Sequence, residues 1–367
     1  MSNVVRFATH TRSPRAAQAP GALAPLLTSF AQHRRREGDA FWLKENAELL
    51  GILAACGTRL PDLALAVYQP FHDAIETQIA FYPQYYRMLL GLTLSLETLG
   101  LAGGKSAALA AWIVAQGWPE SEVNDLQRAE TRYLLARAGQ VIDEPGLDAR
   151  LMRFLSRPAV FALPNPRAAY DLLHVIFYLS HYGQRPLDLP EPARLSLLHL
   201  GCLAHLEQNG DLLAEVCLAL RFTGQPQPAS WRAFCEAEAS AFRVERGACE
   251  DSSDAYHNYL VNQWLLSVNG ATAFCEHFVA GPMRIRLDKP LISPLREWSQ
   301  ALLSLGEGRS ADWPEMRIRC APHLSGRALE LADQGAADSP GFETFFAAFA
   351  RASTPVRAAP HSLRVGA

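Results

Sequence analysis

The sequence contains no run of about 18 consecutive apolar residues, so no segment is predicted to span a membrane. Residues 1–22 carry arginines among Ser, Thr and Pro and have no continuous apolar core, unlike a secretory signal. We expect them to form a flexible tail, and we expect the same of residues 353–367. These absences predict a cytoplasmic protein with no membrane partner.

No pair of cysteines has the Cys-x-x-Cys spacing of a metal or redox motif, and the seven cysteines are scattered along 367 residues. A chain of this length buries an apolar core without cross-links, so such cysteines are typical of small buried side chains in a reducing compartment. An excess of basic charge is also lacking, because the formal net charge is −3 at pH 7. We therefore expect no nucleic-acid partner, and we interpret Arg34, Arg35 and Arg36 as a solvated helix end.

The signatures of several large enzyme classes are absent. The chain has no G-x-x-x-x-G-K-[ST] or G-x-G-x-x-G phosphate loop, no G-x-S-x-G nucleophile turn and no H-E-x-x-H zinc motif. Glu207, Asp211 and Glu215 have the spacing of a carboxylate row on a helix, but no Glu-x-x-His pair occurs in the chain, and di-iron bundles require one. We exclude the di-iron interpretation and expect Asp211 to cap a helix.

Helical periodicity dominates what the sequence does contain. Apolar residues recur at spacings near three and four from residue 23 to residue 56, with Gly38 and Asp39 as a break and an N-cap. Extended structure is predicted only over 283–287, where apolar and polar residues alternate. Because one isolated strand cannot form a sheet, the predicted fold class is all-α. Further helices are expected over 60–71, 76–99, 105–116, 121–137, 167–182, 192–206, 211–223, 228–245, 254–268, 295–305 and 342–352.

Helices of this length joined by short turns predict an antiparallel helical array, either an α/α solenoid or a closed, toroid-like ring. No exact sequence repeat accompanies the array. A turn cluster at 143–146 marks a change in composition. It predicts two helical subdomains, an N-terminal one over residues 23–145 and a C-terminal one over residues 146–352.

The segment from residue 170 to residue 183 concentrates side chains that carry chemistry. On a helix, Tyr170, His174, Tyr178 and His181 fall along one stripe. The helix is apolar nearly all round and is expected to be buried, where an unsatisfied imidazole or phenol costs about 1–3 kcal/mol. Two interpretations stay open. The row is either a hydrogen-bonded structural feature, or the wall of a pocket in which His174 and Tyr178 are catalytic and Tyr170 and His181 bind substrate.

A second segment, residues 254–264, is dense in hydrogen-bonding groups. Asp254 lies three residues before His257, and a carboxylate there can orient the imidazole and raise its basicity, as a general base needs. The alternative is that Asp254 only caps the helix. Asn258 and Asn262 follow on the same helix, and we expect them to bind substrate.

A transition metal is a further hypothesis for these histidines. His174 and His181 are separated by a helical rise of about 10.5 Å, against about 6 Å for the i, i+4 spacing that usually supplies two ligands. That pair is therefore a poor chelator on its own, and a metal would need ligands from another helix. The sequence leaves the cofactor and its ligands undefined.

Two stretches are similar to segments of bacterial proteins of unknown function. Residues 41–50 (FWLKENAELL) with residues 81–87 (FYPQYYR) resemble an alphaproteobacterial all-helical family. Residues 170–183, together with Tyr256 and His257, are similar to a motif in other bacterial proteins. The resemblance implies a bacterial origin and a helical fold, and it implies no activity for any residue.

Two functions from different classes remain. In the first, the protein is an enzyme or a small-molecule-binding protein whose pocket lies in the C-terminal subdomain, between the helices of His174 and His257. In the second, it is a non-catalytic adaptor whose concave face binds a protein or peptide. A closed cavity with the two histidines facing each other favours the first, and an open groove with the histidines far apart favours the second. The substrate, the reaction and the oligomeric state are not determined by the sequence.

Overall fold

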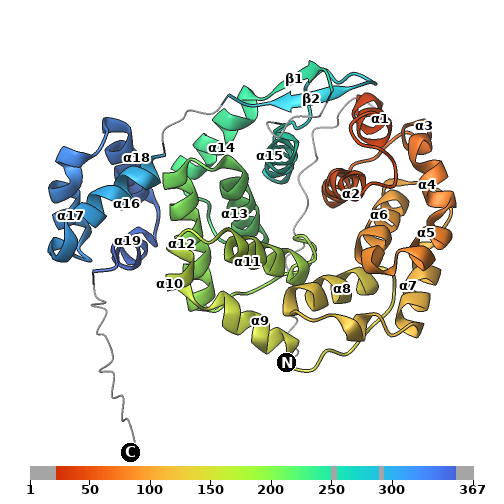
Figure 1. Ribbon diagram of the computed structural model, residues 1–367, viewed down its shortest axis with the longest axis horizontal. Coiled ribbons are helices and arrows are strands. Elements are labelled where there is room, and N and C mark those ends of the chain that lie inside the picture. Colours follow the sequence, from red (N-terminus) through yellow and green to blue (C-terminus); the bar gives the residue numbers. More distant parts are fainter. Residues whose placement is uncertain (1–21, 249–253, 289–292, 353–367) are drawn as a thin grey trace, which may run out of the picture.

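The computed structural model describes residues 22–248, 254–288 and 293–352 (Figure 1). These residues are helical along most of their length and include one two-stranded sheet, which confirms the predicted all-α class. The described part contains no helix that is both long and apolar enough to cross a bilayer. Both predicted tails, apart from Ala22, and Cys249 lie outside the described residues.

The elements follow the chain in this order. The first half contains α1 (Ala24–Gln32), α2 (Ala40–Ala55), α3 (Asp62–Leu65), η1 (Ala66–Tyr68), α4 (Gln69–Asp73), α5 (Ile75–Phe81), η2 (Pro83–Tyr85), α6 (Tyr86–Leu99), α7 (Ser106–Ala115), η3 (Pro119–Ser121), α8 (Asp125–Arg137), α9 (Leu147–Leu155), α10 (Pro158–Phe161) and α11 (Pro166–Leu179). The second half contains α12 (Glu191–Glu207), α13 (Gly210–Phe222), α14 (Ala229–Ala241), β1 (Arg243–Arg246), α15 (Tyr256–Val268), β2 (Met283–Arg286), α16 (Pro294–Ser304), η4 (Gly306–Gly308), α17 (Trp313–Cys320), η5 (Ala321–His323), α18 (Gly326–Asp338) and α19 (Phe342–Ala350).

Local capping chemistry sets several helix boundaries. Asp39 caps α2 as predicted, because its carboxylate accepts a hydrogen bond from the Phe41 amide at 2.7 Å. The single helix predicted over 76–99 is wrong. Pro83 divides it into α5 and α6, since proline has no amide hydrogen to continue the helical bonding.

The inner helices pack in a closed circuit, visible in Figure 1. In the order α2, α6, α8, α11, α13 and α15, each helix packs against the next, and α15 packs against α2. The intervening helices, among them α7, α9, α12 and α14, pack on the outside of this circuit. The inner side chains therefore meet around one central region. Whether the array is to be classed as a solenoid or a toroid stays a prediction.

A two-stranded antiparallel sheet lies beside α15, which the chain forms between its two strands. β2 confirms the extended structure predicted over 283–287, and it pairs antiparallel with β1, so that Val244 lies opposite Ile285. The helix predicted over 228–245 is wrong at its end, because α14 stops at Ala241 and the chain turns into β1. The extended conformation of β1 depends on pairing with a strand some 40 residues away, so local propensity does not predict it.

The last helices form a separate group at one side of the circuit, drawn in blue in Figure 1. Helices α16, α18 and α19 pack against α12, and aromatic side chains of α16, α17 and α19 pack against one another. The sequence analysis did not predict α17 or α18. The predicted boundary near residue 145 stays a prediction.

Candidate active site

His257 lies in the first turn of α15 and is held by a carboxylate from a different helix. Its Nδ1 lies 2.8 Å and 3.0 Å from the two carboxylate oxygens of Asp211. Asp211 lies in the first turn of α13. The N-cap of this helix is Asn209, whose side-chain oxygen accepts a hydrogen bond from the Leu212 amide at 3.2 Å. The prediction that Asp211 caps this helix is therefore wrong, and its carboxylate is left to bind the imidazole.

Asp254 does not orient His257, which corrects the predicted pairing. Helix α15 begins two residues after Asp254, so the two residues do not share a helical face. The Asp254 carboxylate binds Arg34 instead, at 2.9 Å, and accepts hydrogen bonds from the backbone amides of Tyr256 and Ile285. Arg34 is itself buried, so its predicted place at a solvated helix end is wrong as well.

The second ring nitrogen of His257 faces two glutamates. Its Nε2 lies 4.0 Å from an oxygen of Glu48 on α2 and 4.0 Å from an oxygen of Glu215 on α13. These separations are too long for hydrogen bonds, but one oxygen atom between them can lie within hydrogen-bonding distance of both ends. Within the described residues, Oε2 of Glu48 is buried and has no hydrogen-bond partner.

Burial changes the pKa values of the side chains around His257. Burial raises the pKa of Glu215 to about 8, and the nearby charge of Asp211 adds to the effect. Burial likewise raises the pKa of Glu48 against the opposing charge of His257. Burial alone lowers the pKa of His257, but the hydrogen bond and charge of Asp211 outweigh it and raise that pKa to about 9. At neutral pH the site therefore holds a protonated His257 imidazolium beside a protonated Glu215.

Helix α11 presents the predicted residues Tyr170 and His174 to the same region. The two rings stack at 3.7 Å, and Nδ1 of His174 lies 3.0 Å from the Tyr170 carbonyl oxygen. Burial, together with the positive charge of His257, lowers the pKa of His174 to about 4. His174 is therefore neutral and lies within the electrostatic field of His257. The charges of Glu48 and Glu215 also act on the phenol of Tyr170.

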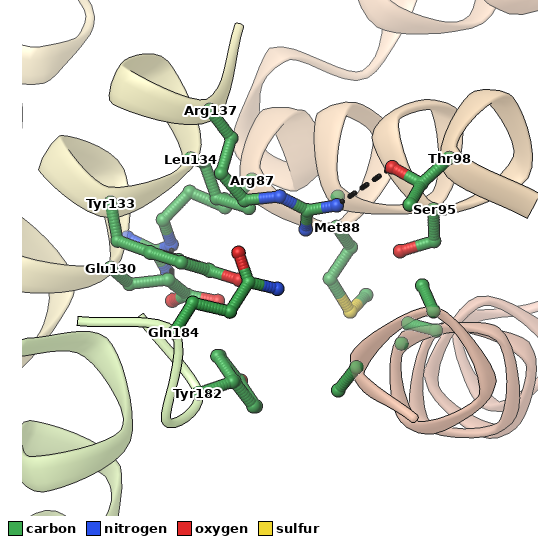
Figure 2. Close-up of a pocket in the computed structure, with 15 residues that line it drawn as sticks. Arg87, Met88, Ser95, Thr98, Glu130, Tyr133, Leu134, Arg137, Tyr182 and Gln184 are labelled. Atoms are coloured by element: carbon green, nitrogen blue, oxygen red, sulfur yellow. Dashed lines mark hydrogen bonds and ion pairs between the residues drawn. The ribbon is translucent and has the colours of Figure 1, made fainter. Parts of the chain in front are cut away.

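Tyr178, the third residue of the stripe, extends the group toward α8. Its hydroxyl hydrogen-bonds Glu130, whose carboxylate forms an ion pair of 3.0 Å with Nε of Arg87 on α6. Burial raises the pKa of Glu130, and the Arg87 charge opposes that rise. Arg87 and Glu130 line a pocket of about 130 Å³ together with Tyr182 and Gln184, which come from the turn after α11 (Figure 2).

His181 does not belong to this stripe, so the predicted row of four residues is wrong at its end. Helix α11 ends at Leu179, and His181 has a left-handed backbone with φ of 49°. Its ring packs edge-on against Tyr133 at 5.4 Å and lines another pocket, beside Arg132 and Arg185.

Asn258 and Asn262 lie on the side of α15 that packs against α14. Nδ2 of Asn262 donates to the Asn258 side-chain oxygen at 2.7 Å and to its carbonyl at 2.9 Å, and the Asn258 amide donates to Glu238 on α14. Both residues are buried. The contacts stabilise the packing of the two helices, and the predicted binding of substrate by these two residues stays a prediction.

The geometry of this site does not identify ligands for a metal ion. Within residues 22–248, 254–288 and 293–352, no group of three His, Cys, Asp or Glu side chains is arranged to hold a metal ion.

The sequence analysis missed three of the site's carboxyl groups. Asp211 and Glu215 are one turn apart on α13, and this spacing could have indicated that their carboxyl groups lie together. The spacing was noted in the sequence, but only as a di-iron motif, which was excluded. Glu48 stands four residues after Lys44, the pattern of an exposed helical ion pair, so nothing in the sequence distinguishes it.

Comparison with known proteins gives one match. A family model described as a domain of unknown function (DUF6902) matches residues 1–352. No curated protein and no solved structure matches the chain. The bacterial origin implied by the resemblance stays a prediction.

Proposed function

The chain belongs to the DUF6902 family, a family of unknown function, and on the geometry of its site we propose that it is an enzyme that transfers protons to and from a small polar molecule. The reaction takes place inside the circuit of inner helices. Side chains from α2, α11, α13 and α15 contribute to it, so the site extends beyond the predicted C-terminal subdomain.

The observation that carries this proposal is the environment of the His257 imidazole. Asp211 holds Nδ1, while Nε2 has two carboxyl groups at 4.0 Å and no hydrogen-bond partner among the described residues. A hydroxyl or water oxygen at Nε2 would lie within reach of both the imidazole and a glutamate. A histidine oriented by a carboxylate, next to a second titratable group, is typical of general acid–base catalysis.

The pKa values suggest separate roles. Glu215 retains its proton at neutral pH, so it is suited to act as the general acid. Loss of the His257 proton to solvent or product prepares the imidazole to act as a base, with Asp211 stabilising its protonated form. Tyr170 and His174 are suited to positioning the substrate, because the neutral imidazole and the phenol both form hydrogen bonds without adding charge.

The chemistry of the wall favours an uncharged or cationic substrate. Glu48, Glu130 and Glu215 all border the region, and the Arg87 charge is already paired with Glu130. Aromatic faces of Tyr170 and Tyr178 add flat apolar surfaces. Carboxyl groups beside aromatic rings suit polyhydroxylated molecules or organic amines.

The adaptor alternative has less support. An adaptor needs an open concave face, whereas α15 packs back on α2 and closes the circuit. Buried carboxyl groups with raised pKa values are destabilising in a scaffold and are typical of functional sites.

We also propose that the protein acts in the cytoplasm. The described cysteines Cys202, Cys217, Cys235, Cys275 and Cys320 are free thiols, four of them buried. This state is usual in a reducing compartment.

The test compares the wild-type protein with His257→Gln and Glu215→Gln. Each protein is screened against sugars, polyols, amides and amines for thermal stabilisation, and ligands that bind are followed by NMR for conversion. We expect turnover of one class by the wild type and a loss of about 100-fold or more in either variant, with binding largely retained. Glu236→Gln, an exposed carboxylate on α14, is the matched control and is expected to behave as wild type. Indistinguishable binding and turnover by wild type and His257→Gln across the panel would overturn the proposal.

A further inference from the structure

A second pocket lies outside the active-site region, between α8, α9 and the turn that follows α11. Its volume is about 370 Å³, within the range of small-molecule sites. Tyr133 and Tyr178 form the wall on the side of the central region, because Tyr133 also lines the pocket of Figure 2 and Tyr178 binds Glu130 there.

One side of this second pocket is basic. Arg132, His181 and Arg185 line it, and Asp148 is the acidic residue in its wall. Asp148 forms an ion pair with Arg132. The Arg185 guanidinium has no ion pair within the described part of the chain. One positive charge in the wall is therefore left without a counter-charge.

The charges of Arg132 and Arg185 act on the imidazole of His181. Burial lowers the pKa of His181, and the charges of Arg185 and Arg132 lower it further. A bound anion would reverse the second effect, because its charge stabilises the imidazolium form. His181 would then gain a proton and become an additional donor to the anion.

An unusual turn directs His181 into this pocket. His181 and Tyr182 have successive left-handed backbones, with φ of 49° and 54°, and such conformations cost about 1–3 kcal/mol per non-glycine residue. Two backbone hydrogen bonds hold the turn, from the Tyr182 amide to Phe177 at 2.8 Å and from the Arg185 amide to Ser180 at 2.9 Å. As a result, His181 lines the second pocket while Tyr182 lines the pocket of Figure 2.

The lining of the second pocket also includes apolar side chains. Ile142, Met152 and Leu187 line it, and each is only partly buried. A ligand that covers these side chains removes apolar surface from water, which contributes about 25 cal/mol per Å².

We infer that this second pocket binds an organic anion, with a phosphate or carboxylate group between His181, Arg132 and Arg185 and a short apolar chain against Ile142, Met152 and Leu187. This site is distinct from the proposed active site. It shares the wall formed by Tyr133 and Tyr178 with the central region, so its occupancy is placed to influence the position of Glu130.

The test measures binding by isothermal titration calorimetry on the full-length protein. The probes are hexyl phosphate, hexanoate, inorganic phosphate and hexylammonium. We expect both hexyl anions to bind, inorganic phosphate to bind at least about tenfold more weakly than hexyl phosphate, and hexylammonium not to bind. Proton NMR is expected to show a rise in the pKa of His181 when hexyl phosphate is bound.

Variants locate the site. Arg185→Gln is expected to weaken binding of both hexyl anions about tenfold or more without a change in melting temperature, because Arg185 is exposed. Arg153→Gln on α9 removes one exposed positive charge outside the pocket and is the control, with unchanged affinity expected. His257→Gln is also expected to bind as wild type does, whatever the outcome for the proposed enzyme.

Four results would overturn the inference. Neither hexyl anion binds, hexylammonium binds as tightly as hexyl phosphate, inorganic phosphate binds as tightly as hexyl phosphate, or Arg185→Gln retains wild-type affinity. Loss of binding in His257→Gln would place the anion in the central region instead and would overturn it as well.

Discussion

Arg34 and Asp254 are 220 positions apart in the chain and form a two-pronged ion pair, with Nη2 to Oδ1 at 2.9 Å and Nη1 to Oδ2 at 3.2 Å. The same guanidinium binds Glu45 at 2.8 Å and donates to the carbonyl oxygen of Met283 at 3.0 Å. One buried side chain therefore joins the end of α1 to α2, to β2 and to the segment that leads into α15. These contacts link residues near the two ends of the helical circuit.

We expect Arg34→Met to lower the free energy of unfolding by about 3–5 kcal/mol, because it leaves the buried carboxylate of Asp254 without its counter-charge and removes one of the two arginines that bind Glu45. Urea unfolding followed by circular dichroism measures the change. Arg36→Met, at an exposed position two residues away, is the control and should stay within about 0.5 kcal/mol of wild type. Equal stability of the Arg34 and Arg36 variants would show that the ion pair does not hold the circuit closed.

Asp211→Asn should lower the pKa of His257 toward or below its ordinary value of 6.5. Burial already favours the neutral ring, and Asp211 supplies the main opposing effect. In the wild type the folded pKa of about 9 exceeds the unfolded one. The contribution to stability is therefore complete below about pH 6.5 and is lost as the pH rises through about 9.

Proton NMR titration of the His257 ring measures this shift, and melting temperatures from pH 6 to pH 9.5 measure the linked change in stability. Asp333→Asn, which removes an exposed carboxylate paired with Arg317, should leave the His257 titration unchanged. A His257 pKa near 9 in Asp211→Asn would contradict the assignment.

Glu215→Gln should be neutral at acid pH and stabilising at alkaline pH. The folded pKa of about 8 lies above the ordinary value of 4.5, so the wild type loses stability as the pH rises between these values, because only the unfolded chain releases its proton there. Glutamine resembles the protonated acid and has no such loss. Melting temperatures should coincide near pH 4.5 and diverge in favour of the variant by pH 8, and parallel curves would show that Glu215 is ionised in the folded protein.

Gly201→Ala should destabilise the protein by about 1–3 kcal/mol through overpacking. A Cβ at this position on α12 would lie 2.1 Å from the ring of Trp231, which is fully buried. Gly51→Ala on α2 is the matched control, because nothing lies within 4 Å of its Cβ position. Gly51→Ala should be stabilising by about 0.5–1 kcal/mol through helix propensity, and urea unfolding compares the two.

Some features of the site followed from local pattern, and others did not. The row of Tyr170, His174 and Tyr178 follows from helical spacing, because these side chains lie one turn apart. His181 does not continue this row, because the helix ends at Leu179 and His181 lies in a left-handed turn. Residue spacing alone does not indicate where this helix ends. The sequence singled out His257, but it named the neighbouring Asp254 in place of Asp211, 46 positions away.

The sequence by itself determined many of the helices of this protein and several of their boundaries, since periodicity, the Asp39 cap and Pro83 all act over distances of four residues or fewer. Tertiary structure alone decided that Arg34 is buried, that β1 pairs with β2, and that Glu48, Asp211 and Glu215 surround one imidazole. These relationships depend on how helices distant in sequence pack into a closed circuit. Side-chain packing and desolvation set that arrangement, and neither is encoded in the spacing along one helix.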